Sequence, residues 1–203
     1  MSRKVNHIEY HLDSKGIKNL PYNEIAAILR GADDIIMSGG RNLLSKILKG
    51  SKEKKIMKLE LFKNPSYGYY SKISIEEILA KIDWMIINDY MDIQYDYRLP
   101  LICYKGKGWE IEMDTYSSEL LEGFDRIINS GADFFNMNYL KDKNRNLILL
   151  FLDKVEGTRN RKYIPLLEAW REIDYKKVRQ RISQVIQRVK RAKTAAAGSS
   201  YCV

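Results

Sequence analysis

The chain has 203 residues, of which 45% are hydrophobic and 30% charged, and its formal net charge is +9. This composition is typical of a folded globular protein and excludes an intrinsically disordered chain. No apolar run approaches the roughly 18–20 residues that span a bilayer, and the N-terminus lacks the apolar segment of a secretory signal. The two cysteines, Cys103 and Cys202, suggest neither a metal site nor a disulfide framework. We therefore expect a cytoplasmic protein.

The positive charge is concentrated in two regions. Residues 41–63 hold eight basic and two acidic side chains, and residues 154–193 hold 13 basic and four acidic ones. This asymmetry favours a polyanionic partner, nucleic acid before a membrane. The alternative is a solvated surface on ordinary helices.

The first half of the chain predicts helices followed by a hairpin. In chain order we expect a strand over 3–12, a turn over 13–16, helices over 21–37, 40–50 and 53–62, a loop over 65–72, a helix over 74–88, and strands over 91–97 and 99–104. The helix after the loop is the clearest, because Ser74 and Glu77 have the spacing of a capping box. Gly50 is expected to end the second helix, and Gly106 and Gly108 to bend the chain. Three helices and a hairpin are the order of a winged helix-turn-helix.

From residue 113 the pattern predicts helices alone. They are expected over 115–129, 146–155, 163–170 and 175–191, with an aromatic segment over 133–140, a loop over 141–146, and a small, polar, disordered stretch over 195–200. The predicted fold class is mainly α with a small β-wing: a winged helix-turn-helix followed by an α-helical domain. The expected division is an N-terminal extension (1–20), the winged helix (21–113), a basic helical domain (114–193) and a tail (194–203).

No catalytic constellation is evident. His7 and His11 are four residues apart but lack a third nearby ligand, so a metal site is not expected. The paired carboxylates Asp33-Asp34 and Asp89/Asp92 are what a magnesium nuclease would need, yet no nuclease motif surrounds them. We expect a non-enzymatic protein without metal or cofactor.

Four blocks of sequence resemble the RQC winged-helix domain that follows the helicase core of RecQ helicases. They are Gly40-Arg41, the run Ile47–Ile56 (ILKGSKEKKI), Tyr67-Gly68 followed by Ser74 and a helix with Trp84, and Leu99–Gly108 (LPLICYKGKG). The chain looks closest to stand-alone bacterial proteins of the RQC-minor type. It has neither the G-x-x-x-x-G-K-[ST] phosphate loop nor the zinc-binding cysteines of the helicases, so it cannot be an ATP-driven motor by itself.

The resemblance implies binding to duplex DNA or to a junction of double and single strands, mainly through phosphates. With the charge pattern, it gives a set of expected nucleic-acid-binding residues: Arg41, Lys46, Lys49, Ser51, Lys52, Lys54, Lys55, Tyr67, Lys72, Tyr97, Arg98, Lys176, Lys177 and Arg179. Tyr97 and Arg98 would lie at the tip of the wing. There Tyr97 would either meet the terminal base pair or pack against the hairpin's own backbone.

A second resemblance covers residues 152–186, which are similar to a single HEAT-like repeat through the segments IPLLEAW and DYKKVR. The basic helix that follows would suit a membrane or a partner as well as DNA. The expected function is therefore non-catalytic DNA binding in repair, recombination or replication, with a nucleoid-associated location. The alternatives are an adaptor that docks on a helicase or nuclease, and an RNA-binding protein in which Tyr67, Tyr69 and Tyr70 stack on bases.

Overall fold

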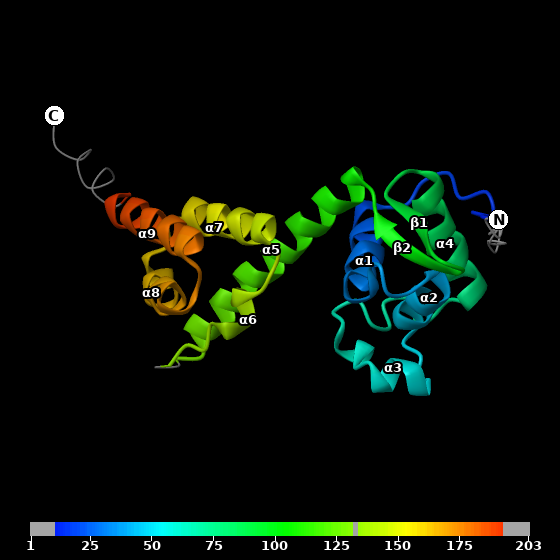
Figure 1. Cartoon of the computed structure of the whole chain (residues 1–203), viewed down its shortest axis with the longest axis horizontal. Helices are drawn as coiled ribbons and strands as arrows, with labels where there is room; N and C mark the ends of the chain where they lie inside the picture. The colour runs from blue at the N-terminus through cyan, green and yellow to red at the C-terminus, as the bar shows by residue number, and fades with distance from the viewer. Residues whose placement is uncertain (1–10, 132–133, 193–203) are drawn as a thin grey trace, which may run out of the picture. The chain divides into compact units, whose positions relative to one another are not determined.

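The computed structural model describes residues 11–131 and 134–192. The chain divides into two compact units between Glu112 and Met113. Residues 3–10 of the predicted strand, His7, and the predicted disordered stretch 195–200 lie outside the described residues. Figure 1 shows helices in both units and one hairpin in the first. The predicted fold class, mainly α with a small β-wing followed by a helical part, is confirmed.

The first unit contains three helices that form its core. Its elements are α1 (Tyr22–Ala32), η1 (Asp33–Ile35), α2 (Arg41–Lys49), α3 (Lys54–Lys58), η2 (Leu61–Lys63), α4 (Ile75–Ile87), β1 (Met91–Asp96) and β2 (Leu99–Tyr104). Helix α2 contacts both α1 and α4, and the fully buried Leu29, Ile47 and Ile82 come one from each of these helices. Apolar residues at helical spacing therefore give each helix one face toward a shared core.

The hairpin is fixed beside the start of α2. Strands β1 and β2 pair antiparallel, from Met91↔Tyr104 to Asp96↔Leu99. The outer edge of β2 bonds the segment before α2, because the amide of Ile102 donates to the carbonyl of Gly39 at 2.9 Å. A Cβ on Gly40 would lie 2.7 Å from the Pro100 carbonyl oxygen, so this approach requires glycine.

Two predicted helices of the first unit are shorter than expected. The helix over 21–37 ends at Ala32 and continues as the 3₁₀ turn η1. The helix over 53–62 is the short α3 followed by η2, because Glu60 takes a left-handed φ of 54° between them. Two local predictions are confirmed: Gly50 ends α2 with a φ of 78°, and Ser74 and Glu77 form the capping box of α4.

The expected bend at the two glycines after β2 is wrong, because a single helix, α5 (Gly106–Asn129), runs through them. Gly108 serves a close contact instead. A Cβ at this position would lie 2.0 Å from the Tyr90 carbonyl oxygen. Helix α5 thus crosses the division between Glu112 and Met113 and contributes residues to both units.

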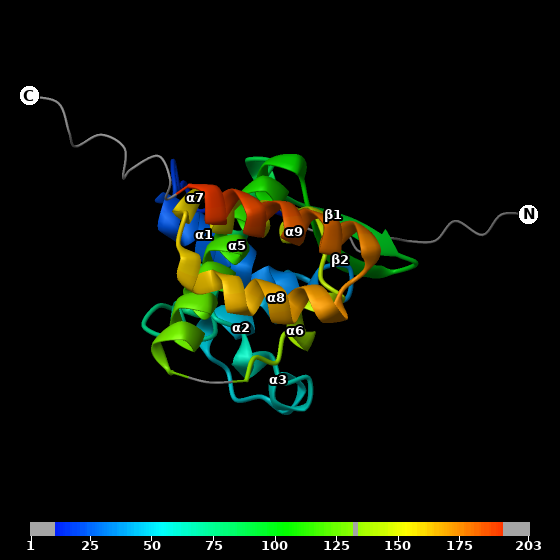
Figure 2. The same cartoon turned by 90° about the vertical axis from the view of Figure 1, so that its left-hand side faces the viewer.

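Among the described residues of the second unit, the regular elements are all helices. After α5 come α6 (Asn138–Lys141), α7 (Arg145–Thr158), η3 (Arg161–Tyr163), α8 (Ile164–Ile173) and α9 (Lys176–Arg191). Helix α9 contacts both α7 and α8, and Figure 2 shows α8 and α9 side by side. The core is aromatic: Phe151 lies edge-on to Phe124 at 4.8 Å between centroids and stacks on Trp170 at 5.8 Å. The similarity to a HEAT-like repeat stays a prediction.

Among the residues that the structure describes, no helix combines the length and the apolar character needed to cross a membrane.

Candidate nucleic-acid interface

The C-terminal end of α2 is capped by a neighbouring loop. The amides of Gly68 and Tyr70 donate to the carbonyl oxygens of Ile47 and Leu48 at 3.0 and 2.8 Å. These carbonyls belong to the last turn of the helix, where the regular intrahelical donors run out; the Ile47 carbonyl also accepts from the amide of the capping residue Gly50 at 2.9 Å. A Cβ on Gly50 would lie 3.0 Å from the Cα of Gly68, so glycine allows the two backbones to meet.

Two predicted contact residues strengthen the contact between the end of α2 and this loop, which we call the junction of the first unit. The Lys49 ammonium donates to the carbonyl oxygens of Ser71 and Ile73 at 2.7 and 2.8 Å. The Tyr67 hydroxyl donates to the carbonyl oxygen of Ser51 at 3.0 Å. Lys49 and Tyr67 therefore hold the end of α2 and the loop together, and their polar groups are already engaged inside the unit.

Five lysines follow the two segments of this junction along the chain. Their side chains are exposed, and no hydrogen bond or ion pair within the described part of the chain engages any of their ammonium groups: Lys52, Lys54, Lys55, Lys58 and Lys72. We call these five residues the basic surface. Lys54 and Lys55 share one face of α3 with Lys58 by i,i+4 and i,i+3 spacing, while Ile56 is buried on the other face. An array of unpaired cations on a fixed backbone suits phosphate groups.

The remaining lysine of α2 in the predicted set is partly neutralised. Lys46 forms an ion pair with Glu53 at 2.7 Å, and both side chains are substantially exposed. Such a pair contributes little to stability, so a phosphate can compete for Lys46 at small cost.

Arg41 is held inside the unit and lies at the opposite end of α2. Its guanidinium forms an ion pair with the Asp83 carboxylate of α4, and the two side chains are 16% and 5% exposed. The second oxygen of Asp83 accepts from the amide of Asp13 at 3.0 Å. Because its charge is compensated there, we leave Arg41 out of the proposed contact residues.

Tyr70 anchors the loop from its inner side. Its hydroxyl donates to the Glu24 carboxylate at 2.6 Å, and the Lys81 ammonium donates to the same oxygen at 2.5 Å. Burial, together with the hydrogen bond to Glu24, raises the pKa of Tyr70 above its ordinary value. Tyr70 is buried and the hydroxyl of Tyr67 is engaged, so Tyr69 is the exposed ring among the three expected to stack on RNA bases.

The tip of the hairpin presents an exposed aromatic ring. Tyr97 is 82% exposed and takes a left-handed φ of 56° in the two-residue loop between the strands. Packing of Tyr97 against the hairpin, one of the two expected arrangements, is excluded by this exposure. Arg98 beside it is exposed as well.

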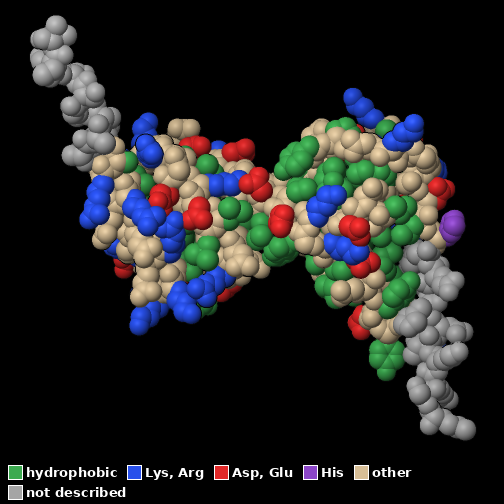
Figure 3. All heavy atoms as spheres, turned by 90° about the horizontal axis from the view of Figure 1, so that it is seen from above, with side chains coloured by type: hydrophobic (Ala, Val, Ile, Leu, Met, Phe, Trp, Pro, Cys, Tyr) green, Lys and Arg blue, Asp and Glu red, His purple; other side chains and the backbone are tan. Residues whose placement is uncertain are grey.

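The expected residues of the second unit lie at the start of α9. Lys176, Lys177 and Arg179 are exposed, and no side-chain partner occurs for them within the described part of the chain. On the face drawn in Figure 3, Lys and Arg side chains gather over the helices of the second unit, with Asp and Glu between them.

The structure does not assemble the carboxylates into a metal site. Asp34 accepts a hydrogen bond from the Asn64 amide at 2.8 Å, and Asp89 pairs with Lys105 at 2.6 Å. Across residues 11–131 and 134–192, no three potential His, Cys, Asp or Glu ligands come together.

Comparison with known families gives one match. Residues 22–121 match the family model described as the RQC domain. Neither the curated proteins nor the solved structures give a match. RQC domains are in general DNA-binding winged helices of RecQ-like proteins, and the three-helix core and hairpin found here have that form. The chain therefore carries an RQC domain over residues 22–121.

Proposed function

We propose that this protein binds duplex DNA without acting on it catalytically, and that the basic surface of its RQC domain contacts the phosphate backbone. The observation that carries this proposal is the set of five exposed lysines without partners within the described residues. They lie in the segments that follow the junction held by Lys49, Tyr67 and the Gly50–Gly68 contact. Phosphate contacts supply affinity but little sequence information, so we expect modest sequence preference.

Salt dependence tests the proposal. If about six cations engage phosphates, a plot of log K, where K is the association constant for DNA, against the logarithm of the salt concentration has a slope near −5. We expect the variant Lys52→Glu/Lys55→Glu to make this slope shallower by roughly 2 units and to weaken binding to all duplex sequences alike. Lys49 is not used, because its replacement would also disturb the loop.

The matched control reverses two exposed lysines elsewhere in the first unit. Lys15→Glu/Lys18→Glu produces the same change in net charge, and neither lysine has a hydrogen-bonded or ion-pair partner for its ammonium group within the described part of the chain. A slope near zero for the wild type, or equal losses in both double variants, would contradict the proposal.

The wing suggests contact with the end of a duplex or a junction. An exposed ring at a hairpin tip can stack on a terminal base pair, and Tyr97 has the exposure for this. We expect Tyr97→Ala to weaken binding to forked DNA more than to a continuous duplex with covered ends. The control Tyr22→Ala removes another exposed ring, 59% exposed, from the first unit. If Tyr97→Ala weakened binding to forked DNA and to the continuous duplex equally, the wing would have no part in the mechanism.

A role as an adaptor is a second candidate. Met57, Leu59 and Phe62, which lie within six residues of one another in the sequence of α3 and η2, are 46%, 51% and 38% exposed. Exposed apolar side chains are a feature of protein contact sites. A helicase or nuclease could dock there in repair, recombination or replication. The triple variant Met57→Ser/Leu59→Ser/Phe62→Ser should then lose such a partner while its affinity for duplex DNA is retained. Loss of DNA affinity alone would argue against the adaptor.

A further inference from the structure

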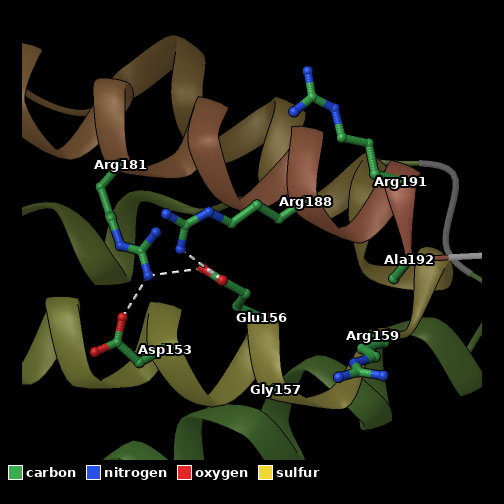
Figure 4. Close-up of a pocket in the computed structure, with 8 residues that line it drawn as sticks. All are labelled: Asp153, Glu156, Gly157, Arg159, Arg181, Arg188, Arg191 and Ala192. Carbon is green, nitrogen blue, oxygen red and sulfur yellow. Dashed lines mark hydrogen bonds and ion pairs between the residues drawn. The ribbon is translucent and has the colours of Figure 1, made fainter.

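A hollow of about 770 Å³ lies between α7 and α9 in the second unit. Four arginines contribute to its lining, namely Arg159, Arg181, Arg188 and Arg191, together with Asp153 and Glu156. Figure 4 shows Arg181 and Arg188 reaching from α9 toward the two carboxylates of α7, while Arg191 points away from them. The arginines come from segments separated along the sequence, so only the packing of α9 on α7 assembles them.

The carboxylates fix the arginines in place. Arg181 donates to Asp153 at 2.6 Å and to Glu156 at 2.8 Å, and Arg188 donates to the other oxygen of Glu156 at 2.8 Å. Burial alone would raise the pKa of Glu156, but the hydrogen bonds from Arg188 and Arg181 outweigh it, and the pKa lies below its ordinary value. Glu156 therefore stays ionised and holds both guanidinium groups in one orientation near neutral pH.

The hollow keeps an excess of positive charge. Four arginines line it against two carboxylates, and Asp153 and Glu156 are bonded to Arg181 and Arg188. Arg159 ends α7 in a left-handed conformation with a φ of 53°, is exposed, and has no side-chain partner within the described part of the chain. Arg188 is 61% exposed although one of its nitrogens is bonded to Glu156. A guanidinium has five N–H donors in a planar fork, so Arg188 can still present donors to a ligand.

We propose that this hollow binds a backbone phosphate of nucleic acid, with Arg159 and Arg188 in contact and Asp153 and Glu156 as positioning residues. Guanidinium groups recognise phosphate oxygens through paired hydrogen bonds. The sites expected from the sequence in this unit, at the start of α9, do not include these residues. The proposal rests on the proposed function, because it gives the same DNA a second point of attachment.

Gly157 allows a test that leaves the ion pairs intact. It lines the hollow, and a Cβ at this position would meet no atom within 4 Å. Gly157→Glu therefore adds a carboxylate at the site without removing an arginine. Gly157→Gln adds the same volume without charge. Gly123→Glu makes the same substitution on α5, where the nearest atom to a new Cβ is 3.8 Å away.

Full-length variants are compared for binding to a short DNA duplex over a range of salt. We expect Gly157→Glu to make the slope of log K against log salt shallower by about 1 unit and to lower the affinity on the order of tenfold at about 0.1 M salt. Gly157→Gln and Gly123→Glu should bind within about twofold of the wild type, since each phosphate contact accounts for roughly 0.9 of the slope and neither variant removes one.

The outcomes separate the two proposals. If Lys52→Glu/Lys55→Glu weakens binding but Gly157→Glu matches Gly123→Glu, the hollow does not bind DNA and the function of the RQC domain stands. If the wild type fails to bind duplex DNA, the proposed function falls and this inference with it. Loss of binding to anionic lipid vesicles, with DNA binding unchanged, would assign the hollow to a lipid phosphate and also overturn the proposal.

A second measurement identifies the contact residue. Arg188→Lys keeps the charge but removes the planar fork, so its affinity should fall although the net charge is unchanged. The side-chain Nε–Hε resonance of Arg188 should shift when the duplex is added to the wild type. An Arg188 resonance that does not respond, together with wild-type affinity in Arg188→Lys, would exclude it from the site.

Discussion

The guanidinium of Arg41 at the start of α2 is bound by the carboxylate of Asp83 on α4, and both side chains are largely buried. This pair joins two of the three core helices. The Asp83 carboxylate also accepts a hydrogen bond from the backbone amide of Asp13 at 3.0 Å. One residue that the sequence assigned to DNA contact thus stabilises the domain that presents the other contact residues.

Removing one partner of this pair should destabilise the protein. Arg41→Met leaves the Asp83 carboxylate buried without its cation, and we expect the free energy of unfolding to fall by about 3–5 kcal/mol. Urea unfolding measures this change. Arg41→Met/Asp83→Leu should recover much of the loss, because no buried charge is then left without a partner. A loss below about 0.5 kcal/mol in the single variant would show that the pair is unimportant.

Gly108 should tolerate no side chain, whereas Gly106 should. A Cβ at Gly108 would lie 2.0 Å from the Tyr90 carbonyl oxygen, and a Cβ at Gly106 would meet no atom within 4 Å. We expect Gly108→Ala to lower the free energy of unfolding by about 2–4 kcal/mol, since the backbone must move to relieve the clash. Gly106→Ala should be neutral or slightly stabilising. Thermal or urea unfolding of the two variants provides the comparison, and similar stabilities would contradict this account.

Lys49 and Lys52 should separate stability from affinity. Lys49→Met removes two hydrogen bonds to the carbonyls of Ser71 and Ile73, and we expect the free energy of unfolding to fall by about 1–3 kcal/mol. Lys52→Met should leave stability within about 0.5 kcal/mol and weaken DNA binding only. Both properties are measured on each variant, and a stability loss in Lys52→Met would mean that the basic surface is also structural.

Glu24 should make stability depend on pH in the acid range. Burial raises its pKa, but the hydrogen bonds from Lys81 and Tyr70 outweigh burial and lower the pKa below its ordinary value of 4.5. The unfolded chain then binds the proton more readily, so the stabilisation is complete above pH 4.5 and is lost as the pH falls through the lower folded pKa.

The measurement for Glu24 is the free energy of unfolding against pH for the wild type and Glu24→Gln. The difference between the two curves should shrink below about pH 4.5. Glu110→Gln, at an exposed position of α5, serves as the control. Its free energy of unfolding should differ from that of the wild type by the same amount at every pH. A constant difference between wild type and Glu24→Gln across this range would contradict the assignment.

Local elements whose signals lie within a few residues can be predicted from the amino-acid sequence alone. The capping box of Ser74 and Glu77, the end of α2 at Gly50 and the hairpin loop between the strands need only neighbouring residues, and all are confirmed. The blocks from Gly40 to Gly108 also indicated an RQC domain, which the match over residues 22–121 confirms.

The role of each charged or flexible residue depends on how the elements pack against one another. Gly108 suggested a bend, but its contact with Tyr90, 18 residues earlier in the numbering, requires glycine inside a continuous helix. Arg41 and Lys49 look like the other cations of their region until Asp83 and the carbonyls of Ser71 and Ile73 are seen to engage them. Arg159 and Arg188 line one hollow only because α9 packs on α7. The reason is physical: periodicity reports the faces of single elements, whereas the partner of a charge is fixed by which elements pack against one another.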